Sequence, residues 1–423
     1  MDIAINTLEQ RLTDVLVKIE LAGVKIDIKK LKDVEQHLLN LLQATTLKIV
    51  ETAGTEINLN SNDQLSKLLF ETLELQPKIT SKSKSGLISV DKSHLEKLKS
   101  DHEIIPLILD YRKTTSLLKF CGQLKEIHPK TGRLHCSLNQ IGTATGRFSC
   151  SNPNLQNIPN VKVSEEETEI LKIIASKLRE VFIAEKECVL IGADYSQIEL
   201  RMITEMSQDE FLLKAYNSDL DIHELTASKV FNIPISEISK QQRSIAKTIN
   251  FGLIYGMSAV GLAESLTSIT KIHHSKDEAE KMMAEYFSQF KRVKSCLDAL
   301  IDYADHHGYS RTLFGRTRPI PELASNTMSE REKGKRLAMN SPVQGSAADI
   351  IKMAMVNCYK AISEKGLKSK IILQVHDELL FEVPEDEVEV MESLIRKEME
   401  NVVRLSIPLT IELAKGKNWA EAH

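Results

Sequence analysis

A short polar turn between two strand-forming runs near residue 377 places the tightest constraint on how this chain can fold. Residues 371–375 and 379–381 are β-prone, and only His376, Asp377 and Glu378 separate them. Two such runs around a tight polar turn predict an antiparallel hairpin. Asp377 would lie at its bend, so we expect a carboxylate at one edge of a sheet.

A second carboxylate follows another strand-like run. The apolar residues 188–193 lead directly into Asp194, and a helix-like stretch begins soon afterwards. Either motif alone is weak, because an aspartate at a strand end is often only a turn or cap residue. Two aspartates on separate strands, however, suit two divalent ions about 3.5–4 Å apart.

A helix between these two motifs has an unusual face. Arg243, Lys247, Phe251 and Tyr255 follow one another at four-residue steps, and Gly256 follows them. This face would change from cationic to aromatic over roughly 18 Å of helix axis. The cations could neutralise phosphates and the rings could lie against a base. The alternative is an ordinary amphipathic helix with core aromatic residues and solvated charges.

A later helix repeats the four-residue spacing with hydrogen-bond donors. Arg336, Asn340 and Gln344 would share one face, and donors in a row can meet minor-groove acceptors that occur in every base pair. In the alternative interpretation these side chains are buried and satisfied within the fold. Pro342 would kink the helix and could free backbone carbonyls for them.

Composition excludes little. The 423 residues are 42% hydrophobic and 27% charged, as in ordinary globular proteins, and the net charge of −4 does not decide for or against a nucleic-acid partner. No apolar run approaches a membrane span, and the six cysteines lack zinc-ligand spacing. We therefore expect a cytoplasmic protein with no membrane attachment.

The coarse organisation follows from apolar spacing and turn residues. Helices are expected over 8–53, interrupted near Gly23, and again from Ser61, where Gln64 would complete a capping box. Residues 143–159 predict an irregular loop, and 206–300 a mainly helical stretch. The last hundred residues predict a helix, a hairpin and another helix.

Several long segments resemble motifs of family A DNA polymerases, the bacterial DNA polymerase I group. The segments lie between about residue 8 and the last residue, and they are 143–147 (TATGR), 154–159 (NLQNIP), 194–201 (DYSQIELR), 221–223 (DIH), 243–256 (RSIAKTINFGLIYG), 374–378 (QVHDE) and 416–423 (GKNWAEAH).

The resemblance implies an α+β protein with a right-hand polymerase fold: a thumb, a palm with an antiparallel sheet, and helical fingers. The expected parts are a segment leading into the palm (1–30), the thumb (31–140), the palm with the first motif (141–205), the fingers with the helix motif (206–335) and the palm with the last motif (336–423).

The resemblance also implies the roles of individual residues. Asp194 and Asp377 would bind two Mg²⁺ ions, for which Mn²⁺ could substitute, with the carbonyl of Tyr195 as a further ligand and Glu378 close by as a catalytic group. Lys247 would donate a proton to the leaving pyrophosphate. The expected nucleotide-binding residues are Glu199, His223, Arg243, Lys247, Phe251 and Tyr255, and the expected DNA-binding residues are Arg147, Asn154, Gln156, Arg336, Asn340, Gln344 and His376.

Glu199 decides which nucleotides we expect. The family uses a glutamate at this place as a steric gate against the ribose 2′-hydroxyl, the group that distinguishes RNA from DNA precursors. Its presence favours deoxynucleotides and argues against a single-subunit RNA polymerase. A salt bridge on the helix surface to a nearby Lys or Arg is the alternative role.

The sequence departs from the family pattern in two places. Residues 163–178 look like an acidic insertion where the family usually has a short basic link. The family's phosphate-binding arginine therefore has no clear counterpart, and Lys177 and Arg179 are the nearest candidates for its role. The chain also starts at the polymerase region, so no 3′–5′ proofreading exonuclease is expected.

These observations predict a DNA-directed DNA polymerase that adds dNTPs to a primer 3′-hydroxyl by two-metal phosphoryl transfer. Its partners would be primer–template DNA and dNTPs, and it would act as a monomer associated with the nucleoid. A single-subunit RNA polymerase and a catalytically inert primer–template binding protein are the competing hypotheses.

Overall fold

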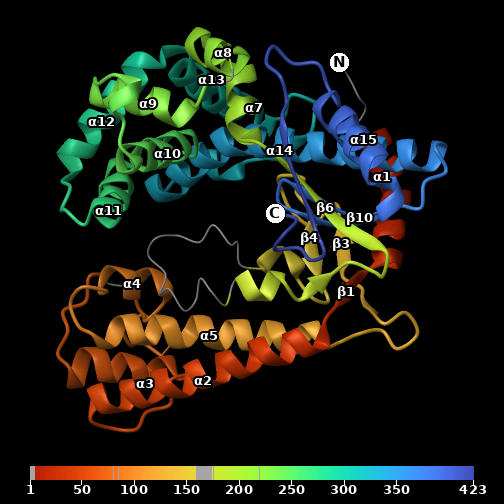
Figure 1. Ribbon diagram of the computed structural model, residues 1–423. Helices are drawn as coiled ribbons and strands as arrows, with labels where there is room; N and C mark the ends of the chain where they lie inside the picture. The colour runs from red at the N-terminus through yellow and green to blue at the C-terminus, as the bar shows by residue number, and fades with distance from the viewer. Residues whose placement is uncertain (1–4, 80, 84, 159–173, 175, 219) are drawn as a thin grey trace.

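The computed structural model describes residues 5–423 apart from 80, 84, 159–173, 175 and 219. Within these residues it is a mixed structure of long helices and short antiparallel sheets, which confirms the α+β class (Figure 1). The acidic insertion expected at 163–178 lies largely outside the described residues.

The helices are α1 (Ile5–Ala22), α2 (Ile28–Ala53), α3 (Asn62–Lys67), α4 (Lys92–Lys97), α5 (Ile104–Leu124), α7 (Ile198–Ser207), α8 (Glu210–Asn217), α9 (Ile222–Phe231), α10 (Lys240–Ile254), α11 (Ala259–Thr270), α12 (Lys276–Gln289), α13 (Lys291–His307), α14 (Met328–Glu364) and α15 (Val388–Glu400). The strands are β1 (Val24–Ile26), β2 (Arg133–Leu134), β3 (Ser137–Asn139), β4 (Ser149–Ser151), β5 (Phe182–Ile183), β6 (Cys188–Tyr195), β7 (Tyr309–Arg311), β8 (Thr317–Pro319), β9 (Lys370–Val375), β10 (Glu378–Pro384) and β11 (Ile411–Gly416).

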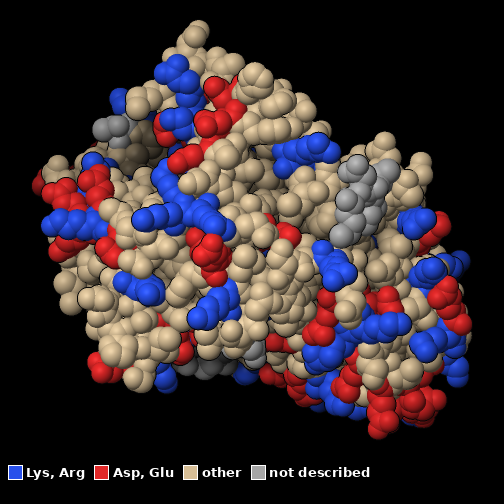
Figure 2. Space-filling model, turned by 90° about the horizontal axis from the view of Figure 1, so that it is seen from above, with Lys and Arg blue, Asp and Glu red and all other residues tan. Residues whose placement is uncertain are grey.

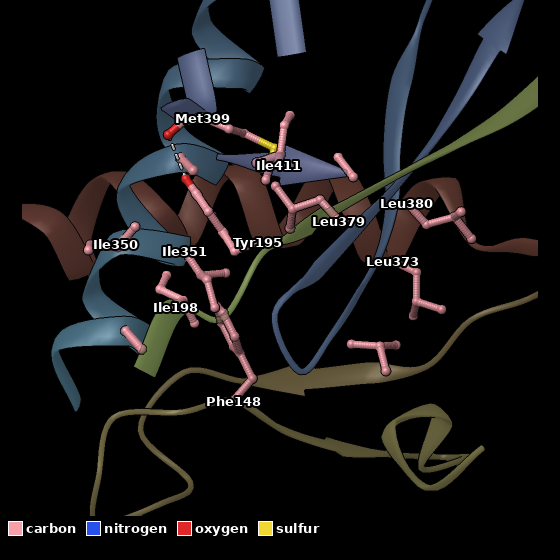
Figure 3. Close-up of a cluster of buried hydrophobic side chains, with 14 of the residues drawn as sticks. Phe148, Tyr195, Ile198, Ile350, Ile351, Leu373, Leu379, Leu380, Met399 and Ile411 are labelled. Carbon is pink, nitrogen blue, oxygen red and sulfur yellow. Dashed lines mark hydrogen bonds between the residues drawn. The ribbon is translucent and has the colours of Figure 1, made fainter. Parts of the chain in front are cut away.

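A four-stranded antiparallel sheet lies at the centre of the molecule, in the order β11-β6-β10-β9. Its apolar side chains pack with helices α7, α14 and α15 in one large core, part of which Figure 3 shows. Within this core the ring of Tyr195, the last residue of β6, points towards α15, and its hydroxyl donates to the backbone oxygen of Met399 at 2.8 Å (Figure 3). This hydrogen bond anchors the end of β6 to α15.

Helices form two bodies on either side of this sheet (Figure 1). On one side α2 and α5 lie side by side as a long arm, and α3 and α4 share a separate apolar cluster with them. On the other side α7 to α13 form a helical lobe. The β9–β10 turn and the end of β6 thus belong to the sheet that joins the two bodies.

Local signals explain where several helices begin. Gly23 adopts a φ of 59° between α1 and β1, so the interruption predicted near this residue is confirmed. Ser61 caps α3 as expected, but only half of the predicted capping box is present, because Gln64 accepts from the backbone of Asn58 instead. A complete capping box starts α10, with Ser239 and Gln242.

Two predictions about strands were wrong. The segment 143–159 was expected to be irregular, yet β4 lies inside it and pairs with β3. The third strand-forming run near the end, β11, was missed, and it completes the central sheet beside β6. β4 has only three residues and β11 alternates apolar and polar residues only at its start, so neither carries a long apolar pattern, and each depends on its pairing partner. Helix α14 continues through Pro342.

A buried ionic cluster joins α1 to the rest of the molecule. Glu9 of α1 accepts from Lys352 at 2.6 Å and from Arg316, and Arg316 also pairs with Asp349 at 2.7 Å. The Lys352 and Asp349 side chains are fully buried. Charges this deep are stable only while each has its partner.

The surface carries both signs of charge. Figure 2 shows basic and acidic side chains interspersed over one face, so the net charge of the whole chain does not describe any single surface. No helix within the described residues is long and apolar enough to cross a membrane.

Candidate active site

The two predicted carboxylates meet at one edge of the central sheet. Asp194 is the penultimate residue of β6, and Glu378 lies directly opposite it on β10. Asp377 occupies the two-residue turn before β10, and its backbone oxygen accepts from the Tyr195 amide at 3.2 Å. The preceding His376 has a φ of 52°, the left-handed conformation that such a tight hairpin turn requires at its first position.

The environment of these carboxylates disfavours their charged form. Burial, with the nearby charges of Asp377 and Glu378, raises the pKa of Asp194 to about 7. Burial also raises the pKa of Asp377. Glu412 on β11, which faces Asp194 across the ladder, adds further negative charge. A cation bound here would relieve this repulsion.

The donor set fits Mg²⁺. Within the described part of the chain, no three His, Cys, Asp or Glu side chains are arranged to hold a metal ion by themselves. Mg²⁺ is typically bound by one or two carboxylates together with substrate phosphates and water. Asp194 and Asp377 supply hard oxygen ligands of that kind, and burial raises the pKa of both carboxyl groups.

Glu378 differs from both aspartates because its carboxylate already has close partners. Trp419 Nε1 donates to its Oε1 at 2.8 Å, and His423 Nδ1 lies 3.3 Å from its Oε2. The buried guanidinium of Arg179 lies 3.8 Å from the same oxygen and stacks over the Trp419 ring at 4.4 Å. Arg179 is therefore not a surface group that could meet an incoming phosphate.

The helix face predicted from four-residue spacing is present on α10. Lys247 is exposed and Phe251 is half-buried, whereas Tyr255 is the residue that ends the helix. Arg243 donates to Asp221, which caps α9, at 2.6 and 2.9 Å. The cationic end of the face is thus solvated and partly paired before any ligand arrives.

His223 lies against this face as a neutral group. It is 3% exposed, its ring centroid is 5.8 Å from that of Phe251, and burial lowers its pKa to about 4. Asn250 Nδ2 lies 3.1 Å from His223 Nδ1. If Asn250 donates, the proton of the imidazole resides on Nε2, which leaves an uncharged N–H donor for a phosphate oxygen.

Glu199 is buried at the start of α7 and pairs with Arg147. The arginine partner expected in the alternative role is present, but Glu199 is buried and does not lie on the helix surface. The gate role stays a prediction. Burial raises the pKa of Glu199 to about 7, although Arg147 opposes the rise. Arg147, which was expected to contact DNA, is half-exposed while it holds this pair.

The remaining DNA-contact candidates are divided. Arg147, Gln156 and His376 line one small cavity of about 40 Å³ beside Gln374, to which Gln156 donates at 3.2 Å. Asn154 caps the short turn at Gln156 with its side chain.

The other three candidates lie on α14. Asn340 donates to the backbone oxygen of Tyr255 at 3.3 Å, which ties this helix to the end of α10. Arg336 is exposed beside Gly256, and Gln344 is half-buried.

Sequence reasoning missed Glu412, gave no individual roles to Trp419 and His423, and considered Arg179 only as a possible phosphate-binding group. Glu412 depends on the strand that was not predicted. Trp419 did carry a signal, because it is the only tryptophan of the chain and belongs to a segment that resembles the family.

Comparison with known proteins agrees with this geometry. The family model described as DNA polymerase family A matches residues 28–421. DNA polymerase I of Caldicellulosiruptor bescii is 44% identical over 422 residues, covering 98% of this chain and 47% of that protein. DNA polymerase I of Geobacillus stearothermophilus is 39% identical over 424 residues, covering 100% and 46%. The chain thus spans about half the length of these relatives.

A solved structure gives the same result for the fold. The POL domain of Pol1 from M. smegmatis, in complex with DNA primer-template and dNTP, superposes with a TM-score of 0.87 at 38% sequence identity. The match covers 98% of this chain and 70% of that one. The right-hand arrangement expected from the sequence is therefore confirmed, and the chain belongs to DNA polymerase family A.

Proposed function

We propose that this chain is a DNA-directed DNA polymerase that adds dNTPs to a primer 3′-hydroxyl. One observation carries the proposal: Asp194, near the end of β6, and Asp377, in the turn before β10, meet at the edge of the sheet. Burial raises the pKa of both carboxyl groups, and the charge of Asp377 raises that of Asp194 further. Such a pair is unfavourable in the free protein and suits cation-assisted phosphoryl transfer.

The primer 3′-hydroxyl would attack the α-phosphate, and pyrophosphate would leave. Two Mg²⁺ ions, or Mn²⁺ in their place, would supply charge neutralisation for this step. Asp194, Asp377 and the carbonyl of Tyr195 would hold them. The protein's main contribution is then to position the reactants.

The triphosphate would lie along the α10 face. Arg243 and Lys247 would neutralise its oxygens, and neutral His223 would donate one hydrogen bond to them. The exposed Lys247 is placed to give a proton to the departing pyrophosphate. Phe251 and Tyr255 would shape the pocket of the new base pair, with Glu199 beneath the sugar as the gate against a 2′-hydroxyl.

Duplex DNA would lie across the cavity lined by Arg147, Gln156 and His376 and against α14, where Arg336, Asn340 and Gln344 face it. Asn154 supports this surface through its cap. We assign the thumb to residues 31–140, the fingers to 206–335 and the palm to 141–205 and 336–423, with 1–30 leading into it.

We further propose that these 423 residues carry no proofreading exonuclease and work on primer–template DNA as a monomer in the cytoplasm, at the nucleoid. Pure protein incubated without nucleotides should leave a mismatched primer end at full length. Shortening of that end would contradict this part of the proposal.

Primer extension tests the proposed function directly. Asp377→Asn should lower the extension rate at least ~10³-fold, about 4 kcal/mol of barrier, because a metal ligand is lost. Its primer–template Kd should stay within about twofold, since the duplex is held elsewhere. Full-speed extension by this variant would contradict the assignment.

The same assay separates the competing functions. The parent protein should use dNTPs far better than rNTPs, and a preference for rNTPs would favour the RNA polymerase hypothesis. Primer–template binding without any extension would favour an inert binding protein.

A further inference from the structure

The last seven residues lie against the catalytic edge of the sheet. They follow β11 and are called the 417–423 segment below. The end of the chain lies beside the central sheet (Figure 1). The backbone amide of Trp419 donates to Phe182 of β5 at 2.9 Å, and Asn418 bridges to Ile183. The segment is thus fixed to the strands near the site.

Gly192 leaves room for this segment. A Cβ at Gly192, two residues before Asp194 on the same face of β6, would come within 1.9 Å of the Ala422 backbone oxygen and 3.0 Å of Glu378 Oε1. Only a residue without a side chain allows the segment and the Glu378 carboxylate to pack over β6 here. The glycine in β6 is therefore required for the 417–423 segment to pack against this strand.

The contacts of the 417–423 segment converge on Glu378. One carboxylate oxygen accepts from the Trp419 indole at 2.8 Å, and the other lies 3.3 Å from His423 Nδ1. Trp419 is 0% exposed and its ring lies beneath the Arg179 guanidinium. A carboxylate held in this way on both oxygens has a fixed orientation.

We propose that the 417–423 segment positions the catalytic site: Trp419 and His423 hold Glu378, so that Glu378 acts as a positioning residue for Asp194 and Asp377 and not as a metal ligand. Glu378 stands opposite Asp194 in the ladder and follows Asp377 directly. Fixing its carboxylate fixes the hairpin turn that carries Asp377. This inference rests on the proposed function, because it concerns the same two aspartates.

The first test removes one donor. Trp419→Phe keeps an aromatic ring for Arg179 but removes the indole N–H, so Glu378 loses its shortest contact. In this proposal Glu378 is the outer-shell partner of the two aspartates, and such partners typically contribute 10–100-fold to metal affinity or activity. We therefore expect the Mg²⁺ concentration for half-maximal extension to rise ~10-fold, with primer–template Kd unchanged within about twofold.

A matched variant separates positioning from simple loss of stability. Asn418→Ala removes two hydrogen bonds between Asn418 and Glu421, at 2.7 and 3.1 Å, within the same segment but does not touch Glu378. It should lower the thermal midpoint while leaving the Mg²⁺ dependence of extension at the parent value. Equal Mg²⁺ dependence for Trp419→Phe and Asn418→Ala would overturn the proposal.

A conservative change at Glu378 distinguishes the two possible roles. Glu378→Gln keeps an oxygen that can accept from Trp419, whereas Glu378→Ala does not. A positioning role predicts that the Gln variant retains at least ~10 times more activity than the Ala variant. Equal and complete loss in both, as in Asp377→Asn, would identify Glu378 as a metal ligand and overturn the proposal.

Trp419 also gives a readout without catalysis, because it is the only tryptophan. Its emission should change when Mg²⁺ is added to the parent protein, and Asp377→Asn should abolish the change. An emission that ignores Mg²⁺ would overturn the inference. If the parent protein showed this response but extended no primer, the proposed function would fail while the positioning role survived.

Discussion

The carboxylates at the edge of the central sheet and the cations on the face of α10 lie in opposite environments. At the sheet edge, Asp194 is held in the ladder of β6 and β10, and Asp377 lies in the turn before β10, where its backbone oxygen accepts from the Tyr195 amide. Burial raises the pKa of both carboxyl groups. On α10, Lys247 is exposed and Arg243 forms an ion pair with Asp221. The acidic part of the site is thus preorganised and uncompensated, whereas the basic part is solvated and already paired.

The difference has a physical consequence for each ligand. A cation arriving at the sheet edge relieves an existing repulsion and needs little rearrangement. A triphosphate arriving at α10 must compete with the carboxylate that already binds Arg243, and exposed charges interact weakly in water. We therefore expect substitutions near the sheet edge to have larger effects than substitutions on the α10 side.

Among changes that keep both aspartates, the largest effect should follow from Glu199→Ala, which opens space beside the carboxylate edge. The preference for dNTPs over rNTPs should fall at least ~100-fold, about 2.7 kcal/mol of discrimination. Single-nucleotide insertion kinetics with both substrates give the measurement. Glu210→Ala, the same change at an exposed glutamate of α8, should leave the ratio unaltered. An unchanged ratio in Glu199→Ala would exclude the gate role.

His223 is the buried exception on the α10 side and gives a pH test. Its folded pKa of about 4 lies below the ordinary 6.5, so the unfolded chain binds the extra proton between these values. Its contribution to stability is complete above pH 6.5 and is lost as pH falls towards 4. Between pH 7 and 4.5 the loss should be about 2 kcal/mol.

Urea midpoints of the parent and His223→Gln across this range measure that contribution. The variant should lose less stability on acidification than the parent, whereas His306→Gln, at an exposed histidine of α13, should follow the parent. Parallel curves for the parent and His223→Gln would show that His223 is not held neutral.

Phe251→Tyr should change the choice between dideoxy- and deoxynucleotides. In the family that this chain resembles, a Phe here goes with poor use of dideoxynucleotides. A tyrosine hydroxyl could replace the missing 3′-hydroxyl near the triphosphate. Dideoxynucleotide incorporation should rise ~10-fold, about 1.4 kcal/mol, with ordinary addition nearly unchanged.

Chain-termination ladders at matched nucleotide ratios test this expectation. Phe287→Tyr, at a partly buried phenylalanine of α12, is the control and should terminate like the parent. The same termination pattern in Phe251→Tyr would mean that Phe251 does not face the sugar.

The smallest effect should come from Asp221→Asn, which keeps the cap of α9 but removes the charge that holds Arg243. The KM for dNTPs should fall about threefold, because the arginine is released for phosphate. Asp209→Asn, which changes the cap of α8 in the same way, should leave KM unaltered. A higher KM in Asp221→Asn would show that the pair positions Arg243 for its substrate.

The sequence predicted those parts of the site that depend on local pattern. The hairpin around Asp377, the strand ending at Asp194 and the helix carrying Arg243 and Lys247 all lie in elements that their own residues favour. The family resemblance then supplied the arrangement of these elements in space, which no local pattern contains.

What could not be predicted depends on contacts between distant segments. Strand β11 alternates apolar and polar residues only over Ile411, Glu412 and Leu413, a pattern too short to predict a strand, and it pairs with β6 along its whole length. The pair of Arg147 with Glu199, the resting pair of Arg243 with Asp221, and the hold of Trp419 on Glu378 each join residues from separate elements. Such pairs leave no periodic trace in the sequence.

The ionic cluster that joins α1 to α14 bears on how much of the chain the fold needs. The family match starts at residue 28, after α1, yet Glu9 of α1 is the direct partner of both Lys352 and Arg316. A shortened chain starting at residue 28 would leave a fully buried ammonium without its carboxylate, at a cost of about 3–5 kcal/mol. We therefore expect a chain that starts at residue 28 to be less stable than one that includes α1, although the family match begins after this helix.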